Sequence, residues 1–159
     1  MTRSTASLAQ FAVLGLWLGA AVFFSAAVAP AVFAVLPTRT LAGAVVGRLL
    51  PSVFYSGMLI GILVIVLQVL AGGEWNVRGR ETAGALMVLA CAVAQFVIAP
   101  RIERVRAEIA GPLESLSLDD ARRIAFGRLH GFSVAWLGLA MIAAAVVVVA
   151  SARTLQSRT

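Results

Sequence analysis

The sequence predicts an all-α protein, a bundle of four transmembrane helices. Four long apolar runs, a content of 61% hydrophobic residues and only 13% charged residues predict this fold class. The runs cover residues 8–36, 51–71, 82–100 and 129–150, and no charged residue interrupts them. About 20 mostly apolar residues in a helix cross a hydrocarbon core of roughly 30 Å. We therefore expect one integral membrane domain over residues 1–159.

A water-soluble helical bundle is the alternative fold for such a chain. Its helices should carry polar residues on their outer face, whereas residues 146–149 are four consecutive valines that make the last run apolar on every side. This pattern favours the membrane.

The first run also has features of a secretory signal peptide. Arg3 precedes it, and Ala27-Val28-Ala29 resembles a cleavage site with two small residues. The run is longer than the usual apolar core of about 7 to 15 residues, and Pro30 stands where a new amino terminus would form. We therefore expect residues 8–36 to be kept as the first span.

The connection between the first two spans predicts a short helix in the membrane interface. Between Pro37 and Pro51, apolar residues recur at helical spacing; they are Leu41, Val45, Val46, Leu49 and Leu50. Pro51 would then begin the second span, where its missing N–H group costs nothing.

Residues 101–128 form a third loop that is too long for a plain turn. Ile102, Val105 and Ile109 predict one apolar helix face that ends before Gly111 and Pro112. This pattern extends the third span as a helix beyond the bilayer.

Helix signals also stand before the fourth span. Ser117 is the expected N-cap, and Asp119 can pair with Arg122 or Arg123. The two extensions would form either a solvated stalk or a docking surface for a partner.

Small residues recur every fourth position in or beside the spans, which allows close approach of helix backbones. The pairs are Gly15 and Gly19, Ser52 and Ser56, Gly57 and Gly61, Ala90 and Ala94, and Gly127 and Gly131. Packing within one bundle accounts for them without a dimer.

The arginines suggest an orientation. The first and third loops carry the larger share of the 13 basic residues: Arg39, Arg48, Arg101, Arg104, Arg106, Arg122, Arg123 and Arg128. By the positive-inside rule this excess places those loops in the cytoplasm. The use of arginine alone is typical of a GC-rich genome and favours a bacterial inner membrane. The net charge of +6 fits contact with anionic lipid headgroups, and no basic and aromatic pattern indicates nucleic-acid binding.

Polar residues inside or next to the spans gather at the end that carries the first and third loops. The candidate vestibule residues are Tyr55, Gln95, Arg101, Arg128, His130 and Ser133. The opposite end has little beyond Gln68. Such residues could also simply anchor helix ends at the interface. If they form a binding vestibule, His130 and Arg101 should converge on a cavity.

An enzyme is disfavoured, and we expect no catalytic residue, cofactor or metal ligand. One histidine and no carboxylate within the spans cannot assemble a metal site in one chain. Ser133 beside His130 lacks a third group to orient the pair. Cys91 lies roughly 13 Å below Pro100, too deep to act with His130. Haem bound by His130 would need a second histidine from another copy, or a methionine, for which Met87 and Met141 lie at the wrong depth. A small haem- or redox-associated membrane subunit is therefore the weakest alternative.

Several motifs resemble those of the transmembrane protein 205-like family. They are Leu36-Pro37 with Arg39 nearby, Arg48-Leu49-Leu50-Pro51 followed by Phe54-Tyr55, Gln95 ahead of Pro100-Arg101, and Phe126-Gly127-Arg128-Leu129-His130-Gly131-Phe132-Ser133. The chain differs from the family pattern at Leu50, Gln95 and Leu137.

The resemblance implies a four-helix integral membrane protein with a large loop between spans three and four and no established molecular activity. It singles out Pro51, Pro100, Arg101, His130, Gly131 and Ser133, with Pro37 as a further structural motif position.

Together these features predict a non-enzymatic membrane protein. It would bind or pass a small solute, an ion or a lipid headgroup at a cytoplasmic-side polar vestibule. The alternative is an accessory subunit that stabilises a larger membrane complex. The expected partners are membrane lipids, with further subunits or copies of the chain left open.

Overall fold

The computed structural model describes residues 3–70, 78–109 and 111–156, and all regular secondary structure in these ranges is helical. The α-helices are α1 (Arg3–Phe23), α2 (Ala29–Val35), α3 (Arg39–Leu70), α4 (Arg78–Ala92), α5 (Ala99–Ala107) and α6 (Ala121–Gln156). Short turns of other helix types are η1 (Phe24–Val28), η3 (Val93–Ile98) and η4 (Leu113–Ser115).

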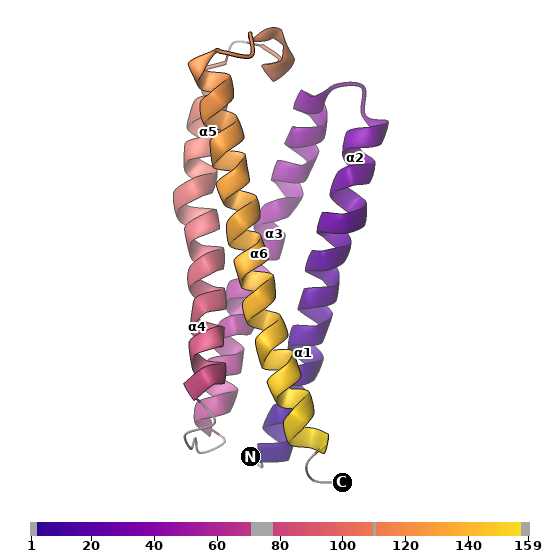
Figure 1. Cartoon of the computed structure of the whole chain (residues 1–159), viewed down its shortest axis with the longest axis vertical. Coiled ribbons are helices and arrows are strands. Elements are labelled where there is room, and N and C mark those ends of the chain that lie inside the picture. The colour runs from indigo at the N-terminus through magenta and orange to yellow at the C-terminus, as the bar shows by residue number, and fades with distance from the viewer. Residues whose placement is uncertain (1–2, 71–77, 110, 157–159) are drawn as a thin grey trace.

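Four rods make up the molecule, and both termini lie at the same end of it (Figure 1). Each rod contains a stretch long and apolar enough to cross a membrane: Thr5–Val35, Arg39–Leu70, Gly79–Ala107 and Ala121–Gln156. The predicted all-α fold with four potential spans is confirmed.

Large apolar side chains lie on the outer surface of the bundle, and many alanines lie in its interior beside a few large core residues. Leu16 is 79% exposed and Leu59 is 68% exposed, whereas Ala90 and Ala144 are fully buried. This distribution suits a lipid solvent, in which small interior residues let helices approach and large apolar residues face the acyl chains.

The rods form a ring in which neighbours make the main contacts, and α3 also touches α6 across it. The two most extensive helix contacts are α1 with α6 and α3 with α4, and further contacts join α4 to α6 and α1 to α3. The described core runs through the middle of this ring and includes Leu14, Trp17, Phe54 and Met87.

Close backbone approach occurs at one of the predicted small-residue pairs. A β-carbon added at Gly57 would stand 2.7 Å from Cys91 Sγ, and one at Gly61 would stand 2.6 Å from Val88 Cγ2. By contrast, Gly127 and Gly131 have no other residue's atoms within 4 Å of such a β-carbon. Only some of the glycine pairs therefore mark helix contacts.

Two prolines are preceded by a π-helical turn. The N–H of Ala29 donates to the Phe24 carbonyl, and that of Ala99 donates to the Ala94 carbonyl, five residues back in each case. The next residues, Pro30 and Pro100, have no N–H group and crowd the preceding turn, and the wider turn accommodates them. The rods therefore continue through both prolines.

The predicted short interfacial helix before a second span at Pro51 is wrong. Residues 39–70 form one continuous helix, with Pro51 inside it. Ala42 and Val46 are buried, so the early turns belong to the bundle and do not lie across its end. Because Pro51 has no N–H, the carbonyl of Gly47 lacks its α-helical donor.

The helical extensions of the third and fourth rods are confirmed, with different ends. α5 stops at Ala107 and α6 begins at Ala121, so the third loop is α-helical only at its two ends, with the short helix η4 between them. Asp120, not Ser117, caps α6, because its Oδ1 accepts a hydrogen bond of 2.8 Å from the Arg122 N–H. Asp120 also pairs with the Arg122 side chain at 2.8 Å, in place of Asp119. The predicted second span (51–71) and third loop (101–128) include residues 71 and 110, which lie outside the described residues.

The end with the termini carries more buried polar groups than the sequence suggested. Gln10 Nε2 donates to Gln68 Oε1 at 2.9 Å and to the Val64 carbonyl at 3.3 Å, and Ser151 Oγ donates to Gln10 Oε1 at 3.4 Å. This set links α1, α3 and α6.

A cation completes the connections at this end. The Arg80 guanidinium on α4 donates to Ser7 Oγ at 3.2 Å, to the Ala150 carbonyl at 2.6 Å and to Thr154 Oγ1. The hydrogen bonds of these residues join all four rods where the sequence had shown little beyond Gln68.

Candidate functional site: a cavity between α3, α5 and α6

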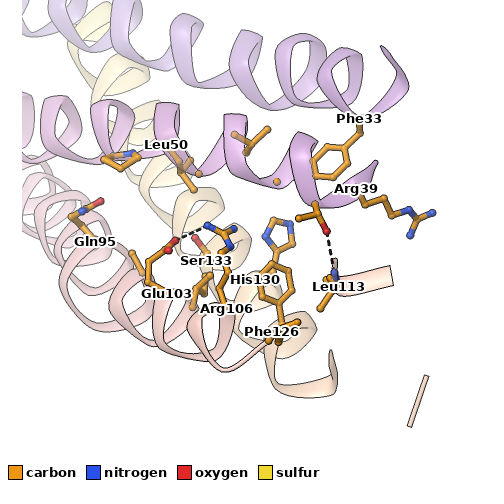
Figure 2. A pocket seen from close by; sticks show the side chains of 18 of the residues that line it. Phe33, Arg39, Leu50, Gln95, Glu103, Arg106, Leu113, Phe126, His130 and Ser133 are labelled. Atoms are coloured by element: carbon orange, nitrogen blue, oxygen red, sulfur yellow. Dashed lines mark hydrogen bonds and ion pairs between the residues drawn. The ribbon is translucent and has the colours of Figure 1, made fainter. Parts of the chain in front are cut away.

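A cavity of about 290 Å³ lies at the end of the bundle opposite the termini. Its walls come mainly from α3, α5 and α6, with further residues from α2, from η3 and from the third loop (Figure 2). It is lined by Phe33, Arg39, Thr40, Gly43, Val46, Gly47, Leu50, Pro51, Phe54, Gln95, Ala99, Ile102, Glu103, Arg106, Ile109, Gly111, Leu113, Phe126, His130 and Ser133.

The inner end of the cavity holds polar groups among apolar neighbours. Gln95 Nε2 reaches the Tyr55 hydroxyl at 3.4 Å, while Gln95 Oε1 is buried and has no hydrogen-bond partner among the described residues. Ser133 is buried, and no hydrogen bond joins its hydroxyl to another residue that the structure describes. Since buried polar groups are normally paired, this end offers unused hydrogen-bonding capacity.

Arg106 lies at the outer end of the cavity. Its Nη1 pairs with Glu103 Oε1 at 2.8 Å, and its guanidinium lies 5.8 Å from the centre of the Phe126 ring (Figure 2). In the part of the chain that is described, its Nε and Nη2 groups have no hydrogen-bond partner. One guanidinium therefore keeps free donors beside the cavity.

Two glycines on α3 leave room for that guanidinium. A β-carbon at Gly47 would lie 3.7 Å from Arg106 Nη1, and one at Gly43 would lie 4.0 Å from Nη2. A longer side chain at either position would occupy the space between α3 and α5. The glycine face of α3 thus lies against the arginine.

His130 stands on the α6 side of the cavity. Its ring is parallel to that of Phe126, with the ring centres 6.5 Å apart. His130 is exposed, and Figure 2 shows it between α6 and α3, close to Phe126 and Arg106. It can donate or accept a hydrogen bond at the mouth of the cavity.

The third loop closes the outer end by contacting α3. The N–H and hydroxyl of Thr40 donate to Glu114 Oε1 and Oε2 at 2.9 and 2.6 Å, and the Leu113 N–H donates to Thr40 Oγ1 at 3.0 Å. Hydrogen bonds from Thr40 are the main cause that lowers the pKa of Glu114 from 4.5 to about 2. The carboxylate is therefore charged at neutral pH, and the loop is tied to α3.

The structure brings three of the six predicted vestibule residues around this cavity: Gln95, His130 and Ser133. Tyr55 does not line it but touches Gln95 and packs edge-on against Phe96. Arg101 and Arg128 are exposed and do not line it. The expected convergence of His130 with Arg101 is absent.

The predicted structural positions have different roles. Pro51 lines the cavity, whereas Pro100 follows a π turn and Gly131 is exposed. Pro37 follows Leu36, whose extended backbone ends α2.

Arg106 is the principal cavity residue that the sequence did not reveal. A spacing of three residues from Glu103 is typical of a solvated ion pair on a surface helix, so the sequence gives no sign of a cavity residue here. The signal that could have found it is the pair Gly43 and Gly47, whose spacing of four residues marks a flat face on the neighbouring helix.

The donor set suits an anion or a polar headgroup better than a metal ion. Within the described residues, no three His, Cys, Asp or Glu side chains gather closely enough to hold a metal. A guanidinium with free donors recognises carboxylates and phosphates. Apolar side chains such as Phe33, Leu50 and Phe54 complete the walls and would suit a hydrocarbon portion.

The stretch from residue 12 to residue 110 matches a family model described as a domain of unknown function, DUF4149. The chain belongs to the DUF4149 family. The DUF4149 match contains the α3 and α5 walls of the cavity and ends before α6, which supplies Phe126, His130 and Ser133. No curated protein and no solved structure matches the chain.

Proposed function

We propose that this DUF4149 protein is a non-enzymatic membrane protein that binds a small amphipathic molecule, such as a lipid by its headgroup, in the cavity between α3, α5 and α6. The observation that carries the proposal is that the cavity extends from the apolar part of the bundle to its charged end. Its inner end lies within the predicted spans, at Phe54, Gln95 and Ser133, and its outer end lies beside Arg106 and Glu103.

The length of the cavity supports an elongated ligand. Gln95 and Arg106 lie eleven residues apart on a continuous helical rod, which corresponds to roughly 16 Å along its axis. The volume of about 290 Å³ lies just below the usual range of small-molecule sites, roughly 300 to 1,000 Å³. A headgroup with the first part of an acyl chain fits these dimensions better than a whole phospholipid.

The arginine distribution supports a cytoplasmic site in a bacterial inner membrane. The first and third loops, which flank the cavity, carry the larger share of the arginines. The resemblance to the transmembrane protein 205-like family agrees with a four-helix membrane protein, and its most specific motif, residues 126–133, supplies three cavity residues.

The test compares Gly47→Leu with Gly127→Leu. Both glycines precede an Arg-Leu pair within a helix, but Gly47 lines the cavity, whereas the space around Gly127 is open to 4 Å. Leucine at 47 should fill the space beside Arg106, and leucine at 127 should leave it free. Each variant is purified in mild detergent, and its bound molecules are measured by native mass spectrometry.

We expect the unmodified protein and Gly127→Leu to retain the same amphipathic molecule and Gly47→Leu to lose most of it. Equal retention by both variants would exclude the cavity as the binding site. A preparation that holds no amphipathic molecule, but a stable second protein, would favour the accessory-subunit hypothesis instead.

A further inference from the structure

The two halves of the chain share a sequence pattern. The pair Ala29-Pro30 recurs as Ala99-Pro100, 70 positions later, and Gly47-Arg48-Leu49 recurs as Gly127-Arg128-Leu129, 80 positions later. The Ala-Pro pairs stand before the first and third loops, and the Gly-Arg-Leu motifs stand at their ends. Because the spacing between the halves grows from 70 to 80 across the loop, the third loop is ten residues longer than the first. Elsewhere the two halves align without insertions.

Local structure follows the same correspondence. A π turn precedes each proline, η1 before Pro30 and η3 before Pro100. Ser25 and Gln95 occupy equivalent positions, 70 apart, and each has a buried side-chain oxygen without a hydrogen-bond partner among the described residues. The π turns follow from the two prolines, whereas the equivalent polar groups at Ser25 and Gln95 are a separate point of agreement between the halves.

Burial agrees at some equivalent positions of the two halves. Trp17 and Met87 are equivalent and both lie in the core, and so are Ala21 and Cys91; in the second rods, Val64 and Ala144 are equivalent and both buried. Other positions differ, since Ala20 is exposed where Ala90 is buried and Val134 is exposed where Phe54 is buried. The two halves therefore share part of their buried faces.

The arrangement of the rods agrees with a two-fold relation between the halves. In the repeat, α1 is equivalent to α4, and α3 is equivalent to α6. A rotation that swaps the two halves turns the contact of α1 with α6 into that of α4 with α3, and these are the two most extensive helix contacts. In transporters built from such parallel repeats, the two repeats are related by an axis along the membrane normal, and the substrate binds between them. We name residues 3–70 the first hairpin and residues 78–156 the second hairpin.

The cavity lies between equivalent positions of the two hairpins. Three pairs of equivalent residues line it: Phe33 with Glu103, Val46 with Phe126, and Leu50 with His130. Arg106, which also lines it, is equivalent to Leu36. At these positions the first hairpin has only apolar side chains. The second hairpin has a carboxylate, a guanidinium, an aromatic ring and an imidazole, from Glu103, Arg106, Phe126 and His130.

We propose that the second hairpin makes the cavity selective for an amphiphile with an anionic headgroup, with Arg106 as the residue that binds the anion. This inference rests on the proposed function and names the ligand class. Arg106 uses one nitrogen on Glu103 and keeps Nε and Nη2 free in the described part of the chain, so it can form charge-assisted hydrogen bonds with a phosphate. The apolar wall of the first hairpin holds the start of the acyl chain, which fixes the ligand in one orientation.

The test replaces Arg106 by the residue that stands at the equivalent position, Arg106→Leu, and uses Arg104→Leu as the matched control. Arg104 loses the same charge on the same helix, but it does not line the cavity and bonds only the Pro100 carbonyl in the described structure. Each protein is placed in bilayer discs of equal parts phosphatidylglycerol and phosphatidylcholine. The lipid that stays bound after release is identified by native mass spectrometry.

The unmodified protein and Arg104→Leu should retain phosphatidylglycerol at least about tenfold over phosphatidylcholine, a factor that corresponds to about 1.4 kcal/mol. Arg106→Leu should retain both lipids equally while it still unfolds cooperatively. Equal loss of preference in both variants would assign the effect to surface charge and overturn the proposal. Displacement of the lipid by millimolar inorganic phosphate alone would overturn the amphiphile as ligand.

Failure of this proposal differs from failure of the proposed function. Lipid that is bound and blocked by Gly47→Leu, but without preference for the anionic headgroup, would overturn only the role of Arg106. Absence of lipid from the unmodified protein would overturn both.

Discussion

Thr40 and Glu114 join α3 to the third loop through two hydrogen bonds, one from the Thr40 N–H at 2.9 Å and one from its hydroxyl at 2.6 Å. The two residues lie far apart in the chain, and their contact closes the outer end of the cavity, which Thr40 and Leu113 also line. The state of one carboxylate therefore affects the shape of the site.

Acid should loosen this closure. The pKa of Glu114 is about 2 in the folded protein against an ordinary 4.5, so its contribution to stability is complete above pH 4.5 and is lost as the pH falls through about 2. Thermal unfolding in detergent between pH 5 and pH 2 should show this loss. In Thr40→Val, which removes the hydroxyl donor, the decline should be smaller.

The pH experiment needs a comparison because the pKa of Asp120 is also lowered, to about 2, chiefly by its hydrogen bond with the Arg122 side chain. Glu114→Gln removes only the titration at 114. An identical decline in Glu114→Gln and the unmodified protein would assign the acid sensitivity to other carboxylates.

Gly57→Ala should destabilise the bundle by about 1–3 kcal/mol, the usual cost of overpacking. The added methyl would stand 2.7 Å from Cys91 Sγ and 2.9 Å from Trp17 Cζ2. Trp17 cannot easily move, because its Nε1–H donates to the Val53 carbonyl at 3.1 Å. The free energy of unfolding in mixed micelles measures the effect.

Gly138→Ala is the control for this substitution. A β-carbon at 138 has no other residue's atoms within 4 Å, and alanine favours helix over glycine by up to about 1 kcal/mol. This variant should be as stable as the unmodified protein or slightly more so. Destabilisation of both variants alike would contradict the contact at Gly57.

Gln10 and Gln68 should show a measurable coupling. Each substitution to leucine leaves the other amide buried and without its partner at 2.9 Å, which should cost about 1 kcal/mol. The double variant should lose less stability than the two single variants together. Strict additivity in unfolding free energy would mean that the hydrogen bond does not stabilise the fold.

Asp120→Ala should lower the thermal stability of the protein more than Ser117→Ala. Asp120 accepts the Arg122 N–H at the start of α6, whereas the Ser117 side chain bonds Asp119, outside that helix. Circular dichroism during heating measures the difference. A larger effect from Ser117→Ala would restore the N-cap that the sequence suggested.

The four potential spans were predictable because their signal is local. An apolar run of sufficient length determines a span whatever its neighbours are, and depth along one helix is read directly from residue number. For the same reason Gln95, His130 and Ser133 could be placed in one layer before their contacts were known.

Features that depend on contacts between rods were not predictable. Pro51 looked like the start of a helix, and its pattern cannot tell a first turn from an interior position. Without the twelve residues of α3 before Pro51, Gly43 and Gly47 have no place beside α5, and Arg106 appears solvated. Gln10 likewise stands alone in an apolar run of the sequence, because its partner Gln68 is on another helix.

The ring of rods also sets the order in which the protein can be completed. α1 is synthesised first, yet its most extensive partner is α6, which is synthesised last. The Ser151 hydroxyl that reaches Gln10 also arrives only then. The first helix must therefore wait in the membrane with its inner face covered by lipid or by α3 alone, and the fold closes only when the final helix enters beside it.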